Sequence, residues 1–254
     1  MRSETTYIEA FKSFYSTPGL AFLVVQQILA NLLVLVLSGL AGWYVFDSFL
    51  LRALVVTVIC TVHYMYSRAN TQLRVAYHYM HVNIEGEGDL GRAKRYSAQK
   101  GRTILKWVFF KAVLGHALFL AESVTRGGLR DRVQSFSTQF FGTDWRTATL
   151  LALPSQAITT DDIPTALRDV GSVSHSLFAI RIICYTLSFI AVFSVAYAYG
   201  FEPVLLGTLT ILYGAVFYVC SQVFNAVQAV AGASVLLNAK KKKKKVGGPV
   251  NVAP

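Results

Sequence analysis

The chain has 254 residues, of which 54% are hydrophobic and 15% are charged, and its formal net charge is +11. Soluble domains carry roughly 25% charged and about 45–50% apolar residues, so this composition excludes most soluble classes. It also excludes disorder over most of the chain, because disordered segments are poor in apolar residues. We therefore expect an all-α integral membrane protein, since a helix satisfies its own backbone hydrogen bonds in lipid.

The first apolar pair follows an N-terminal segment, residues 1–19. It runs from Leu20 to Phe46 and from Phe49 to Tyr66, with a short break around Asp47. A membrane-crossing helix needs about 20 apolar residues, so residues 20–66 predict a helical hairpin that spans or re-enters the bilayer. Ser38 and Gly42 form a small-xxx-small pair, which favours close helix approach through self-association or ordinary packing.

A mixed central segment, residues 67–176, carries 14 Lys/Arg against 9 Asp/Glu. Because excess Lys and Arg mark the cytoplasmic side, we expect this segment and both termini in the cytosol. Its beginning is rich in Tyr and His, including Tyr77, His78 and His81. We expect these rings at the headgroup level, because a tyrosine ring is apolar while its hydroxyl prefers water. His78 and His81 have i, i+3 spacing but lack the further ligands of a metal site.

The sequence Gly86-Glu87-Gly88-Asp89-Leu90-Gly91 fits G-x-G-x-x-G. Its acidic residues would repel a pyrophosphate, so it predicts a turn and no cofactor. Arg92, Lys94 and Arg95 follow, and they indicate contact with anionic lipid headgroups rather than nucleic acid, because the neighbouring spans tie them to a membrane.

A further apolar segment, residues 104–124, is interrupted by Lys106, Lys111, His116 and Glu122. Each charge at the centre of a membrane costs about 2.5–3.5 kcal/mol, so we expect an interfacial helix rather than a fifth span. The segment 125–165 receives no assignment.

The second apolar pair, residues 177–223, is broken at Gly200-Phe201-Glu202-Pro203. Gly permits positive φ and Pro ends a helical pattern, so a second hairpin is expected. Thr210 and Gly214 form another small-xxx-small pair. Arg181 lies near the start of the pair, where it either snorkels to the interface or, with His63 and Arg52, marks a transport path.

An amphipathic interfacial helix is expected at residues 224–239. Its apolar face is Val223, Phe224, Val227 and Val230. The tail, residues 240–254, begins with six lysines, which attract anionic lipid at about 1 kcal/mol each or simply fix the topology. These lysines are Lys240, Lys241, Lys242, Lys243, Lys244 and Lys245.

No catalytic or metal-binding constellation stands out, so an enzyme is not expected. Two apolar hairpins, a hydrophilic segment between them and an amphipathic helix after the second resemble the reticulon homology domain. The local likeness lies at Asp169-Val170-Gly171-Ser172-Val173-Ser174-His175-Ser176-Leu177, which leads into Phe178–Tyr199 and then Val204–Asn225. The first hairpin is similar in pattern only, and the helix at 104–124 and the lysine run depart from the family.

The resemblance implies a homo-oligomeric protein that shapes endoplasmic reticulum membrane by inserting hairpins into the cytosolic leaflet. A second hypothesis is a non-catalytic structural subunit of a larger hetero-complex, for example in the mitochondrial inner membrane. A third is a small transporter or channel. In each case the lipid bilayer is the principal partner.

Overall fold

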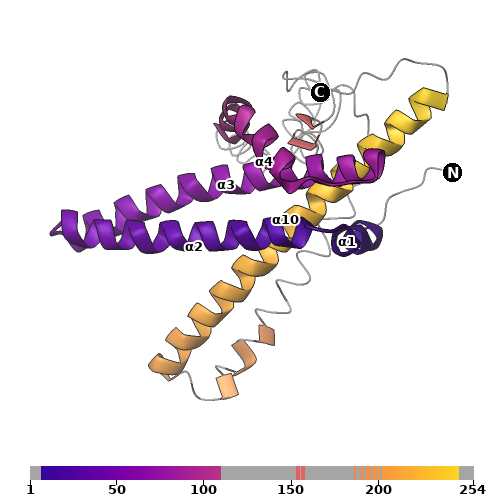
Figure 1. Ribbon diagram of the computed structural model, residues 1–254. Coiled ribbons are helices and arrows are strands. Elements are labelled where there is room, and N and C mark those ends of the chain that lie inside the picture. Colours follow the sequence, from indigo (N-terminus) through magenta and orange to yellow (C-terminus); the bar gives the residue numbers. More distant parts are fainter. Residues whose placement is uncertain are drawn as a thin grey trace, which may run out of the picture.

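The protein is seen in a computed structural model that describes residues 7–109, 153–154, 156–157, 186, 190–191, 193–195, 197–198, 200 and 202–245. Within these ranges the regular secondary structure is helical and there is no strand. The elements are α1 (Tyr7–Ser16), α2 (Leu20–Val45), α3 (Phe49–Glu85), α4 (Leu90–Gln99) and α10 (Pro203–Lys245), and residues 101–109 are also helical (Figure 1).

Three of these helices are long and apolar enough to cross a membrane, by length and composition, and the expected all-helical class is confirmed. They contain the stretches Leu20–Val45, Phe49–Glu85 and Thr208–Asn238. At 1.5 Å per residue, α2 alone is about 39 Å long, more than the hydrocarbon thickness of about 30 Å.

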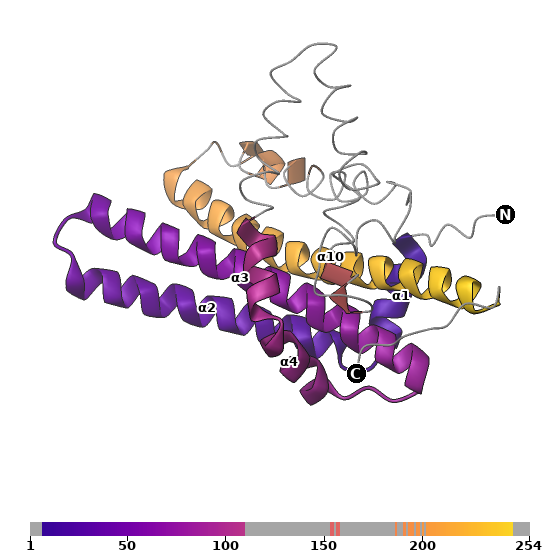
Figure 2. The same ribbon diagram turned by 90° about the horizontal axis from the view of Figure 1, so that it is seen from above.

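Helices α2 and α3 lie side by side as an antiparallel pair (Figures 1 and 2). The chain reverses where Phe46 takes an extended conformation, with φ −122° and ψ 134°. Arg52 closes this turn, because its Nε donates to the Phe46 carbonyl and its guanidinium lies 4.7 Å from the centre of the Trp43 ring. Arg52 is therefore a turn residue.

Two of the three long helices, α3 and α10, extend well beyond the lengths needed to cross a bilayer. Helix α3 runs on from Tyr66 to Glu85, and α10 runs without a break to Lys245. These continuations pack together with α1, α4 and residues 101–109 into a region that we call the base. Its core side chains include Ala10, Phe14, Leu73, Ala76, Tyr96, Ile104, Trp107, Val227, Val230 and Ala233.

The other halves of the long helices project away from the base, and we call them the arms. They are residues 28–45 of α2, 49–66 of α3 and 203–220 of α10. The α2–α3 arms and the α10 arm diverge as they leave the base (Figure 1). Their large apolar side chains are exposed, including Leu33, Val36, Leu40, Leu50, Leu54, Val62, Ile211, Leu212 and Val216.

The structure corrects the expected place of the tyrosine- and histidine-rich segment. Tyr77, His78, Tyr79 and His81 are buried in the base. Tyr77 stacks on Tyr96 of α4, with ring centroids 4.2 Å apart. The rings are therefore covered by protein where headgroups were expected.

The expected interfacial amphipathic helix is instead part of a longer helix that is packed in the base. Residues 224–239 are the continuation of α10, and Val227 and Val230 are fully buried against the rest of the base. Val223 and Phe224 are partly buried against the same core. The run Ala226-Val227-Gln228-Ala229-Val230-Ala231-Gly232-Ala233 is rich in small residues, which lets neighbouring helices approach closely. The apolar face is therefore a protein-packing face.

The first arm of the expected second hairpin, residues 177–199, lies mostly outside the described residues. Its described members, such as Thr186, Ile190 and Ser194, are helical. The expected positive φ at the turn is confirmed, because Gly200 has φ 73°. Arg181, most of residues 104–124, and residues 125–152 and 158–176 also lie outside the description.

Candidate membrane surface and polar seam

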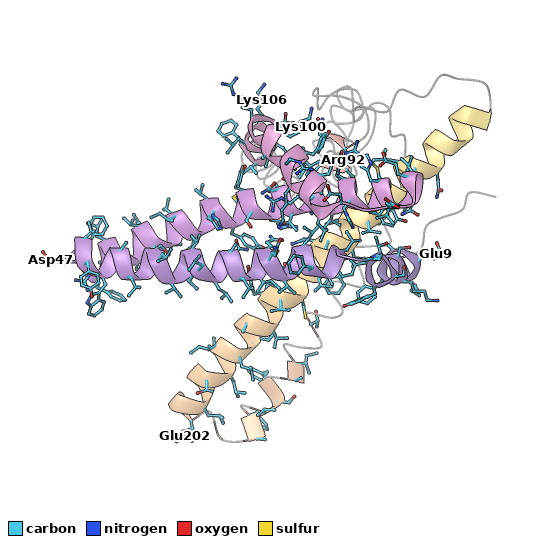
Figure 3. The ribbon with its side chains drawn as sticks, in the orientation of Figure 1. Glu9, Asp47, Arg92, Lys100, Lys106 and Glu202 are labelled. Atoms are coloured by element: carbon cyan, nitrogen blue, oxygen red, sulfur yellow. The ribbon has the colours of Figure 1, made fainter. Side chains whose placement is uncertain are left out.

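Charged side chains lie at the two ends of the arms and leave the surface between them apolar. Figure 3 shows Asp47 and Glu202 at the tips, and Arg92, Lys100 and Lys106 beside the base. The α3 arm, residues 49–66, has a length of about 27 Å at 1.5 Å per residue, close to the bilayer core of about 30 Å. An exposed apolar belt of this height matches a hydrocarbon layer.

The first small-xxx-small pair lies inside the α2–α3 contact. Ser38 Oγ is 3.3 Å from Cys60 Sγ. A Cβ atom on Gly42 would lie 3.0 Å from Val56 Cγ2, so α3 already occupies the space beside this glycine. The pair therefore serves packing within the chain.

The second pair is different. Gly214 is exposed on the α10 arm, and a Cβ atom there would meet nothing within 4 Å. Thr210, one turn earlier, is exposed on the same helix. Gly214 therefore leaves room for another helix to approach.

A line of polar side chains joins α2, α3 and α10 where the arms leave the base, and we call it the polar seam. Asn31 Nδ2 donates to the Tyr218 hydroxyl at 2.5 Å. The Tyr64 ring of α3 lies against Tyr218, with centroids 6.1 Å apart. These contacts tie all three long helices together, as polar side chains do between helices in lipid.

The seam continues with buried amides for which the described residues supply no hydrogen-bond partner. Gln222 and Asn225 are 1% and 2% exposed, and their side-chain polar atoms make no hydrogen bond within the described part of the chain. On α2, Nε2 of Gln27 is also buried without a hydrogen bond. Burying an unpaired amide costs about 1–3 kcal/mol on protein scales, so these groups favour water or another polar partner.

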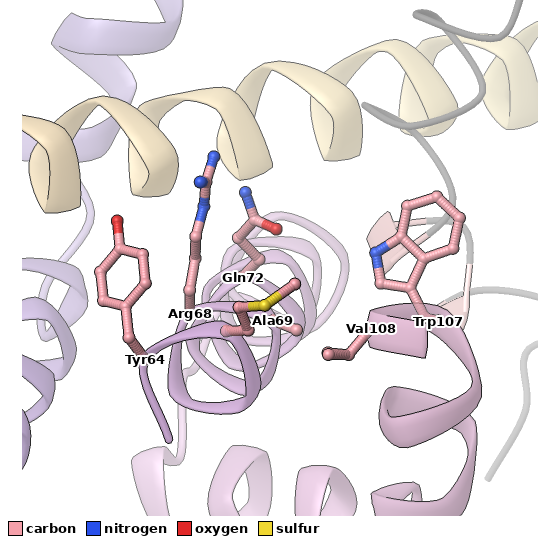
Figure 4. Close-up of a pocket in the computed structure, with 7 residues that line it drawn as sticks. Tyr64, Arg68, Ala69, Gln72, Trp107 and Val108 are labelled. Atoms are coloured by element: carbon pink, nitrogen blue, oxygen red, sulfur yellow. The ribbon is translucent and has the colours of Figure 1, made fainter. Parts of the chain in front are cut away.

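Two cavities flank Tyr64. One, of about 190 Å³, is lined by apolar side chains together with Asn31, His63, Tyr64 and Tyr218. The other, of about 160 Å³, lies between α3 and residues 107–108, and Arg68 and Gln72 point from it toward α10 (Figure 4). Both have space for a few waters, but neither contains an acid and base in a catalytic arrangement.

The glycine motif forms the turn between two helices. Gly86 has φ 80° and ends α3, and Asp89 begins α4, where its Oδ1 accepts from the Gly91 N–H at 2.6 Å. This backbone hydrogen bond, and a second one involving Arg92, lower the pKa of Asp89. The turn that the sequence predicts is thus confirmed, and it connects two helices rather than a strand and a helix.

Two of the histidines of α3, His78 and His81, make contacts within the base. His78 Nε2 lies 2.8 Å from the Pro18 carbonyl oxygen, and His81 Nδ1 lies 2.8 Å from Glu85 Oε1. No group of three or more possible metal ligands occurs within the residues described above.

The basic residues expected to contact lipid lie on α4 at the edge of the base. Arg92 pairs with Glu85 at 3.2 Å, Arg95 pairs with Asp89 at 3.3 Å, and all four side chains are partly or largely exposed. Such surface pairs are weak, so they compete poorly with phosphate groups. Lys94 Nζ lies 6.0 Å from the centre of the Phe22 ring. Lys240–Lys245 form the end of α10, where only the backbone is described.

Sequence reasoning missed α1, which forms part of the base. The signal was the spacing of Ile8, Phe11 and Tyr15 on one face and of Ala10 and Phe14 on another. Ten residues are short for a periodicity argument, and the helix precedes a much stronger apolar stretch.

Comparison with protein-family models, with curated proteins and with solved structures finds no match for this chain.

Proposed function

We propose that this protein is a non-catalytic membrane scaffold that bends the bilayer of the endoplasmic reticulum. The observation that carries the proposal is the division of the long helices into exposed apolar arms and a packed base. The arms enter the bilayer, and the base lies at the cytosolic surface. In this proposal the shape of the embedded protein bends the bilayer, and no reactive group is needed.

The number of elements packed around the long helices differs between the base and the arms. At the base, α1, α4 and residues 101–109 pack around α3 and α10. The arms have no comparable layer among the described residues, and they diverge with their apolar surfaces uncovered (Figure 1). A protein that takes up more area at one membrane surface favours curvature toward that surface, as interfacial helices do.

Charge supports the same orientation. Arg92, Lys94 and Arg95 lie beside the base, and the lysine run ends the helix that leads out of it. The tips carry Asp47 and Glu202. Excess Lys and Arg mark the cytoplasmic side, where anionic headgroups attract them.

Self-association extends local bending into a coat. Ser38 and Gly42 are already used inside the chain, so the exposed Gly214 of the α10 arm is the position that supports contact with a second copy.

The proposal is tested by reconstituting the full chain into anionic liposomes and imaging them by cryo-electron microscopy at increasing protein density. We expect tubules, and we expect Gly214→Leu to reduce them. Gly39→Leu is the matched control, because Gly39 also faces open space but lies on the other arm pair. Vesicles that stay spherical at high density of inserted protein would contradict the proposal.

A second candidate, a small transporter or channel, is favoured by the unpaired amides of the polar seam and by the cavity beside Asn31 and His63. Intramembrane polar groups commonly mark transport paths. This candidate would be supported if proteoliposomes of the native chain conduct small polar solutes and the Asn31→Leu variant does not. Sealed vesicles without flux would exclude it.

A further inference from the structure

Helix α1 has a buried face and an exposed apolar stripe. Ala10 and Phe14 are 1% and 2% exposed and belong to the core of the base. Ile8 and Tyr15 are 64% and 60% exposed, and Phe11 is exposed between them. Residues at i, i+3 and i+7 share one side of a helix, so these three side chains form a single apolar stripe.

The helix is fixed across the end of α2. Figure 1 shows α1 end-on while α2 runs across the picture, and Figure 2 shows α1 along its length. The turn between them is held by Thr17 Oγ1, which donates to the Ser13 carbonyl at 2.7 Å, and by the contact of His78 with the Pro18 carbonyl. If α2 crosses a bilayer, α1 thus lies parallel to the membrane surface.

The stripe faces the side on which the arms extend. Glu9 points away from the arms (Figure 3). At about 100° per residue, Phe11 lies roughly 160° around the helix from Glu9, and therefore on the arm side. Ser16 is exposed about 20° from Glu9, and the exposed Lys12 lies between Glu9 and Ile8.

The depth of α1 also matches the membrane interface. It lies next to Leu20, where α2 begins, and the exposed apolar surface of α2 starts at Phe22. Lys94 lies over that Phe22 ring, which places a cation where the apolar belt begins. Aromatic rings such as Tyr15 prefer this level, because one end is apolar and the hydroxyl is wet.

We propose that α1 is an in-plane membrane helix whose stripe of Ile8, Phe11 and Tyr15 inserts into the boundary between headgroups and acyl chains of a lipid bilayer. The inference rests on the proposed embedding of the arms. Insertion of this stripe adds area to the base-side leaflet only, which is the leaflet that the curvature mechanism requires to expand.

The test uses the full chain in lipid nanodiscs with its three cysteines replaced by alanine and a single cysteine carrying an environment-sensitive fluorophore. Tyr15→Cys reports on the stripe, and its neighbour Ser16→Cys, on the polar side, is the matched control. Leu33→Cys in the α2 arm reports on embedding of the arms. Lipids brominated at shallow or deep acyl positions serve as quenchers.

We expect shallow bromines to quench the label at position 15 severalfold more than the label at 16, and deep bromines to quench the label at 33. Equal, weak quenching at 15 and 16 with strong quenching at 33 would overturn the role of α1 and leave the embedded arms intact. Weak quenching at 33 as well would overturn the embedding, and this inference with it.

Discussion

Individual residues decide how closely the arms pack. Gly42 lies against Val56 of α3, whereas Gly39, on the same helix, has open space beside it. We expect Gly42→Leu to destabilise the fold by about 1–3 kcal/mol, because overpacking forces neighbours to move. Equilibrium unfolding in mixed detergent micelles measures this change.

The matched variant Gly39→Leu gains the same helix propensity without a clash, so its stability should stay level or rise. Equal effects of the two substitutions would show that α3 does not occupy the space beside Gly42.

The sequence could predict the small residues but not their use. Ser38 with Gly42 and Thr210 with Gly214 have the same spacing, and yet only the first pair is covered by another described helix. Spacing gives the face of a helix, whereas the partner on that face comes from the tertiary arrangement.

At the scale of elements, α4 depends on its N-cap. The backbone N–H of Gly91 donates to Asp89, and the pKa of Asp89 is lowered chiefly by this bond. A carboxyl whose pKa is lower in the folded state stabilises the helix above its unfolded pKa of about 3.9 and loses that contribution as the pH falls through the folded pKa.

We therefore expect Asp89→Ala to lower the hydrogen-exchange protection of α4 at pH 7, and the native chain to lose the same protection when the pH is lowered from 7 to below the folded pKa of Asp89. Asp89→Asn retains a capping oxygen without the charge, so its protection factors should not change between these pH values. Unchanged protection in Asp89→Ala would contradict the capping role.

Helix α10 carries the buried amides of the polar seam. If Gln222 and Asn225 have no partner, replacing both with leucine should stabilise the protein by about 1–3 kcal/mol, because the cost of burying the amides disappears. Thermal unfolding in detergent checks this, with Gln228→Leu, at a half-buried neighbour, as the control. A loss of stability in the double variant would indicate that water or another polar partner holds the amides.

The apolar pattern predicted where long helices run but not what covers them. Val227 and Val230 have the spacing of an interfacial face, and in the structure they pack against the base. Periodicity shows that one face avoids water, and both lipid and protein satisfy that requirement. The burial of Tyr77 and His78 was missed for the same reason.

At the scale of the whole molecule, the separation of arms and base organises every other feature. Among the described residues, net positive charge gathers at the base, apolar surface gathers on the arms, and α1 lies at the boundary between them. Composition alone predicted a membrane protein with a basic side. The packed base needed the structure, because it joins segments as distant as Phe14, Leu73 and Val230.

The central claim is that the arms lie inside a bilayer while the base stays outside it. Single cysteines at Leu33, Leu54 and Leu212, all exposed on the arms, and at Arg95 on the base test it in sealed vesicles with a membrane-impermeant maleimide. We predict labelling at position 95 and none at the three arm positions until detergent is added. Labelling of the arm positions in intact vesicles would contradict the account.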